Sequence, residues 1–119
     1  MPEQDSGPAR PDHDLEREFS AKMEGLYGEA AVLGYRPTRY LQMVRRRGGL
    51  GAAKYLLHRY PNPEDLSPGL LRLAELGHPE ISVEALIVSE PWRSLFTDEE
   101  VAIAQQRLAR LGYRQGSVR

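Results

Sequence analysis

The chain contains no cysteine among its 119 residues. This absence excludes disulfide bridges and thiolate metal sites, and it fits the reducing cytoplasm. No stretch approaches the roughly 20 consecutive apolar residues that a membrane-spanning helix requires, so we expect no membrane partner. The opening segment, MPEQDSGPARPDHD, is polar and acidic and lacks the apolar core of a secretory signal peptide. We therefore expect a cytoplasmic protein.

Acidic residues are missing from one long internal segment, residues 30–63. This acid-free segment carries seven of the 16 basic residues and four of the six tyrosines, whereas the rest of the chain holds 9 basic and all 17 acidic residues. The formal net charge is only −1, so charge is sorted along the chain rather than present in excess. Such sorting favours an anionic partner, either a nucleic acid or an acidic face of another protein. The seven basic residues are Arg36, Arg39, Arg45, Arg46, Arg47, Lys54 and Arg59.

Apolar residues recur at spacings of three and four along most of the chain, which predicts helices. The expected helices cover about residues 14–33, 38–47, 50–60, 68–76, 83–88 and 98–111, with glycine or proline between them. Residues 81–88 also suit a strand because they are rich in β-branched side chains, but no partner strand is visible and Ser82 can cap a helix. Thr97 and Glu100 have capping-box spacing. We predict an all-α fold, a compact bundle of five or six short helices.

The chain length indicates one domain with tails. Residues 1–13 combine proline, glycine and charged residues without periodicity, which predicts a disordered N-terminal tail. Residues 14–113 form the expected single helical domain, and residues 114–119 are expected to be a frayed C-terminal tail.

Four short patterns resemble those of a known family. They are GYxPTxYLQM at 34–43, SVEAL at 82–86, LFTxEE at 95–100 and RLxxxGY at 107–113. Over about residues 15–113 the chain is similar to an uncharacterised small helical bacterial module, which occurs alone and joined to larger proteins, some related to nucleases or phage defence. That family has no established activity, so the resemblance implies no catalytic residue. Family members usually carry acidic residues around the Gly-Gly turn, where this chain has arginines at 45–47 and Gly51.

Helical geometry gathers basic residues around Gly48-Gly49. Arg39, Met43 and Arg46 share one face of the second expected helix, and the third begins directly after the turn. Arginine side chains and the free N–H groups of that helix start are suited to phosphates. The run Gly49-Leu50-Gly51 resembles the Gly-hydrophobic-Gly turn of helix-hairpin-helix DNA-binding units, which hold phosphates without reading bases. The alternative is a tight turn that needs glycine for a positive φ angle.

The basic residues have a second interpretation, in which they form ion pairs with acidic helices inside the protein. The candidate partners are Glu16, Glu18, Glu24, Glu29, Asp98, Glu99 and Glu100.

We predict a non-enzymatic binding or adaptor module that contacts the phosphates of DNA or RNA without sequence specificity. The alternative function is a protein–protein docking module, for a nuclease or defence partner or for a second copy, with an apolar anchor such as Trp92 or Met43. Trp92 also suits a purely structural role, packing the last helix onto residues 81–88.

Catalytic and metal-binding patterns are weak. The three histidines, at positions 13, 58 and 78, lack the i, i+3 or i, i+4 spacing of a helical metal site, so we expect no metal. Glu24, Glu29, Glu75 and Glu84 are candidates for acid–base chemistry, but solvated surface positions are the expected role for each. No dinucleotide or phosphate-loop motif is present, so we expect no cofactor and no catalytic residue.

Overall fold

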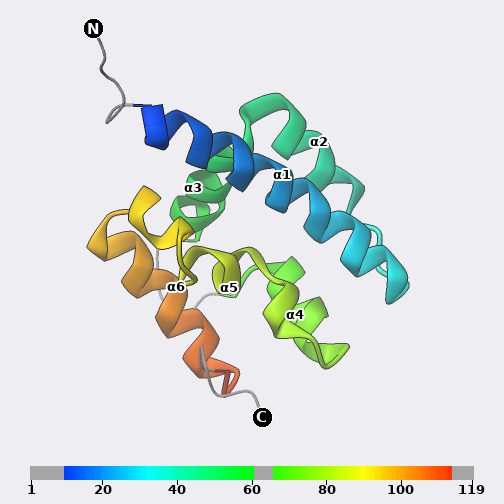
Figure 1. The fold of residues 1–119 in the computed structure, drawn as a ribbon. Helices are drawn as coiled ribbons and strands as arrows, with labels where there is room; N and C mark the ends of the chain where they lie inside the picture. The colour runs from blue at the N-terminus through cyan, green and yellow to red at the C-terminus, as the bar shows by residue number, and fades with distance from the viewer. Residues whose placement is uncertain (1–9, 61–65, 114–119) are drawn as a thin grey trace, which may run out of the picture.

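The computed structural model describes residues 10–60 and 66–113, and within these ranges the chain forms helices and no strand (Figure 1). The predicted all-α bundle is confirmed. None of the helices in these ranges is long and apolar enough to cross a membrane. The elements are α1 (Arg10–Val32), α2 (Thr38–Arg47), α3 (Gly49–Arg59), α4 (Pro68–Glu75), the 3₁₀ turn η1 (Pro79–Ile81), α5 (Val83–Ile87), the 3₁₀ turn η2 (Trp92–Leu95) and α6 (Asp98–Arg110).

Local signals set most helix boundaries. Ser67 Oγ accepts a hydrogen bond from Leu70 N, and Ser82 Oγ accepts one from Ala85 N, so both serines are N-caps. Residues 83–87 are therefore a helix, as predicted. α1 begins at Arg10, earlier than expected, which makes residues 10–13 helical rather than part of a tail. The other residues of the two predicted tails, and the prolines that follow α3, lie outside the described residues.

Helix α3 lies in the middle of the fold, in contact with α1 and α2 and also with α6 (Figure 1). The Phe19 ring of α1 is fully buried against two aromatic rings of the η2 region. Ring centroids are 5.8 Å apart for Phe19 and Trp92 and 5.6 Å apart for Phe19 and Phe96. Trp92 is only 7% exposed, so it packs inside the core and cannot serve as a docking anchor on the surface.

Gly48, which separates α2 from α3, and Gly49, the first residue of α3, need to be glycine for different structural reasons. Gly48 has a φ angle of 79°, and its N–H donates to Val44 O at the end of α2. A left-handed φ of this kind strains any residue with a Cβ. Gly49 has no positive φ, but a Cβ at this position would lie 2.5 Å from Ser20 Cα. The close approach of α3 to α1 therefore requires glycine at position 49.

Candidate nucleic-acid interface

A cleft of about 690 Å³ opens between α2 and α3 on one side and the first turn of α4 with η1 and the start of α5 on the other. Five of the seven basic residues of the acid-free segment line it, together with all four of that segment's tyrosines. The charge sorting seen along the sequence thus becomes a charge cluster in space. The basic and aromatic lining residues are Arg36, Arg39, Arg46, Arg47, Arg59, Tyr35, Tyr40, Tyr55 and Tyr60.

The five arginines come from the segment before α2, from α2 itself and from the last turn of α3. All five are exposed, and none forms an ion pair with an acidic side chain in the described ranges. The Arg47 guanidinium carbon lies 4.1 Å from the centroid of the Tyr55 ring, a cation–π distance. Arg59 Nη1 donates to the same tyrosine's hydroxyl at 2.9 Å. Tyr55 therefore holds two guanidinium groups of the cleft close together.

Arg59 has a second phenolic neighbour. Its Nε donates to Tyr60 Oη at 3.4 Å, and the hydrogen bonds to Tyr60 and Tyr55 raise the pKa of this guanidinium above its ordinary value. The charge on Arg59 is therefore permanent at any pH that the fold survives.

Tyr40 fixes the base of the cleft from α2. Its hydroxyl donates to Met23 O of α1 at 2.5 Å. Burial raises the pKa of this phenol far above its ordinary value, and the negative charges of Glu84 and Glu24 add to the shift. Tyr40 thus remains a neutral hydrogen-bond donor, and it joins the cleft to the core.

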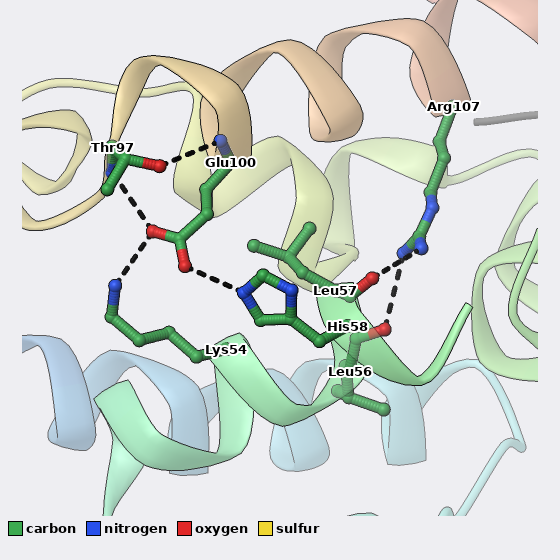
Figure 2. Close-up of polar contacts among 7 residues, drawn as sticks. All are labelled: Lys54, Leu56, Leu57, His58, Thr97, Glu100 and Arg107. Carbon is green, nitrogen blue, oxygen red and sulfur yellow. Dashed lines mark hydrogen bonds and ion pairs between the residues drawn. The ribbon is translucent and has the colours of Figure 1, made fainter. Parts of the chain in front are cut away.

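Lys54 lies outside the cleft lining and belongs to a different arrangement, between α3 and the start of α6 (Figure 2). Its Nζ lies 2.7 Å from Glu100 Oε1, and His58 Nε2 lies 2.9 Å from Glu100 Oε2. The backbone N–H of Thr97 also donates to this carboxylate at 2.9 Å, which completes the predicted capping box. The alternative interpretation, pairing with an acidic helix, is therefore correct for Lys54.

The pKa of Glu100 follows from these contacts. Burial acts to raise it, but the hydrogen bonds from Lys54, Thr97 N–H and His58 prevail and hold the pKa at about 2. Glu100 therefore stays ionised down to strongly acidic pH and fixes α3 to the N-terminus of α6.

Arg45 also lies apart from the cleft. Its Nε is 3.9 Å from Glu24 Oε2, and both side chains are largely exposed. An exposed pair at this distance contributes little to stability.

A buried ion pair that we did not expect from the sequence supports the wall of the cleft. Arg107 of α6 is fully buried, and its Nη1 lies 3.1 Å from Glu84 Oε2 of α5. The same guanidinium donates to the carbonyl oxygens of Leu57, at 3.0 Å, and of Leu56, at 3.5 Å, as Figure 2 shows. It also donates to Tyr60 O. Arg107 therefore satisfies the terminal carbonyls of α3 from another helix.

The expectation that Glu84 is solvated is wrong. Its side chain is 5% exposed, and burial raises its pKa above the ordinary value even though Arg107 opposes the shift. The sequence does hold a signal for this pair. Glu84 is the single charge in an apolar run, and Arg107 lies three residues after Ala104, within the apolar stripe of α6.

The remaining predicted contact residues divide between buried and exposed positions. Gly49 is buried, and its N–H donates to Ser20 Oγ at 2.9 Å, so this amide is not free for a phosphate. Gly51 is exposed on α3 but lies outside the cleft lining. Met43, the second predicted anchor, is half-buried and lines the cleft. The chain therefore shares with helix-hairpin-helix units a glycine turn between two helices, but its Gly49 amide is not available to hold a phosphate. The arginines of the cleft form the candidate surface instead.

Within residues 10–60 and 66–113, no group of three or more His, Asp or Glu side chains is placed to hold a metal ion. Comparisons with protein-family models, curated proteins and solved structures found no match to this chain. The resemblance to the bacterial module therefore stays a prediction.

Proposed function

We propose that this protein is a non-enzymatic binding module whose arginine-lined cleft contacts the phosphates of nucleic acid without sequence specificity. The observation that carries the proposal is the convergence of five exposed arginines on one cleft, with no acidic partner for them in the described part of the chain. Outside the acid-free segment, acidic residues outnumber basic residues 17 to 9, so the cleft is a positive region on a protein whose net charge is −1. Arginine forks are well matched to phosphate oxygens.

One wall of the cleft adds a weaker positive contribution. Ser67, Pro68 and Gly69 line the cleft from the first turn of α4. The N-terminus of a helix carries a partial positive charge, which faces the arginines across the cleft and favours an anion between them. Glu84 is the one acidic residue of the lining among the described residues, and Arg107 compensates its charge.

The test is fluorescence anisotropy of labelled DNA and RNA at several salt concentrations. Binding near micromolar at low salt is expected to weaken as salt is added. The slope of the logarithm of the binding constant against the logarithm of the salt concentration is expected to reach about −3.5 if all five arginines meet phosphates of a single strand. The double variant Arg39→Gln/Arg46→Gln is expected to weaken binding and to make this slope shallower by about 1.4.

The matched control is Arg93→Gln/Arg110→Gln, which removes the same charge from exposed positions outside the cleft. This control is expected to retain most of the affinity. Absence of binding at low salt would overturn the proposal, since phosphate electrostatics are strongest there. An equal loss of affinity in the two double variants would also overturn it, because binding would then depend on the total charge alone. In either case the cleft would be reassigned to an acidic protein partner.

A further inference from the structure

The cleft differs from a simple basic patch because its interior is apolar and aromatic. Met43 of α2 and Leu56 of α3 line it from one wall, and Leu70 of α4 and Ile81 of η1 line it from the other. A flat surface of arginines is enough to hold the backbone of a rigid duplex, whose bases stay stacked inside the helix. A recessed apolar interior provides nothing for a phosphate but suits the faces of unpaired bases.

The arginines are also divided between the two ends of α2. Arg39 lies in the first turn, three residues after Arg36, whereas Arg46 and Arg47 lie in the last turn. Seven residues separate Arg39 from Arg46, which corresponds to a rise of about 10.5 Å along the helix. A single phosphate group cannot occupy both ends. The spacing suits two phosphates of one chain, with Tyr40 and Met43 between them.

We propose that the cleft selects single-stranded nucleic acid by accepting an unpaired base between Tyr35, Tyr60 and the apolar interior, while arginines at both ends of α2 hold the flanking phosphates. This inference rests on the proposed function and adds the substrate class. It predicts a preference for single strands over duplexes and a dependence on bases that phosphate contact alone does not produce.

The experiment compares three oligonucleotides of equal length and sequence: a single strand, its duplex, and a single strand in which several central nucleotides are abasic. The abasic strand keeps every phosphate and loses the stacking faces. Its affinity is expected to fall roughly tenfold, the size of one or two lost stacking contacts, whereas its salt slope stays the same. The duplex is expected to bind more weakly than the single strand at every salt concentration.

The protein variant Tyr35→Leu/Tyr60→Leu keeps apolar volume and removes the aromatic faces. It is expected to bind the intact strand about as weakly as the wild type binds the abasic strand. Tyr27→Leu, at a partly buried tyrosine outside the cleft, is the control, and thermal unfolding checks that all variants are folded.

Two results would overturn the inference. Equal binding of all three oligonucleotides would do so and would leave the proposed phosphate contact intact. Competition by a nucleoside monophosphate at the same concentration as the oligonucleotide would show a small-ligand pocket instead of a strand site. If none of the three binds at low salt, the proposed function itself fails.

Discussion

Replacing the buried Glu100 carboxylate by an amide (Glu100→Gln) removes one charge and keeps nearly the same shape. The amide oxygen can still accept the Thr97 N–H, so the change isolates the charge from the cap. A pKa lowered from 4.5 to about 2 corresponds to about 3 kcal/mol of stability at neutral pH. We therefore expect Glu100→Gln to lower the free energy of unfolding by about 2–3 kcal/mol at pH 7.

The pH dependence of the free energy of unfolding is a more specific test. Because the pKa of Glu100 is lower in the folded state than in the unfolded state, its contribution is present above about pH 4.5 and is lost as the pH falls toward 2. Between pH 5 and pH 3 the wild type is expected to lose about 2 kcal/mol more than Glu100→Gln. Urea unfolding followed by circular dichroism at several pH values in this window measures the difference.

The control is Glu99→Gln, which removes an exposed carboxylate from the same helical turn. Its stability is expected to parallel that of the wild type at every pH, because an exposed carboxylate is well solvated in both states. If Glu100→Gln keeps the full acid sensitivity of the wild type, the contacts with Lys54 and His58 do not set the pKa of Glu100, and the reasoning is refuted.

Three further changes test other parts of the fold by chemical unfolding. Arg107→Met leaves a buried carboxylate unpaired and is expected to destabilise by about 3–5 kcal/mol, whereas Arg110→Met, at an exposed position, stays within about 0.5 kcal/mol. Gly49→Ala forces α3 away from α1 and is expected to lower the free energy of unfolding by about 1–3 kcal/mol. At Gly51 an added Cβ meets only a side chain, at 3.5 Å, so Gly51→Ala is expected to be neutral or to stabilise the fold by up to about 1 kcal/mol. Thr97→Ala removes a cap and lowers stability by about 1 kcal/mol. If Arg110→Met destabilised the protein more than Arg107→Met, or Gly51→Ala more than Gly49→Ala, the packing described above would be contradicted.

The helices could be predicted from the sequence because their signals are local. Spacings of three and four, the caps at Ser67, Ser82 and Thr97, and glycine at helix ends all act within a few residues. The sequence did not predict that α1 begins at Arg10, because residues 10–13 lie ahead of the apolar stripe that begins at Leu15. Neighbouring residues are therefore enough to predict that a helix forms, but they did not predict the exact residue at which α1 begins.

The site could be predicted only in part, because it depends on contacts between distant segments. Charge sorting pointed to the correct stretch of chain. The sequence did not determine which basic side chains pair with an acidic residue, because such partners can be distant in the chain. Lys54 and its partner Glu100 are 46 positions apart. The opposite wall of the cleft, formed by α4 and the region before α5, gave no signal at all. Periodicity predicts which face of a helix is apolar, but it does not predict which other helix will face it.

The basic residues of the acid-free segment thus divide into two sets, and one pair of variants separates their roles. Lys54→Met removes a hydrogen bond to a buried carboxylate, so we expect a loss of about 2 kcal/mol in stability and unchanged affinity for single-stranded DNA. Arg46→Gln removes an exposed charge with no acidic partner in the described ranges, so stability is expected to stay within about 0.5 kcal/mol while affinity falls. Urea unfolding and anisotropy on the same two proteins measure both quantities. If Arg46→Gln lost stability and kept its affinity, the cleft arginines would serve folding, and the case for a nucleic-acid surface would be lost.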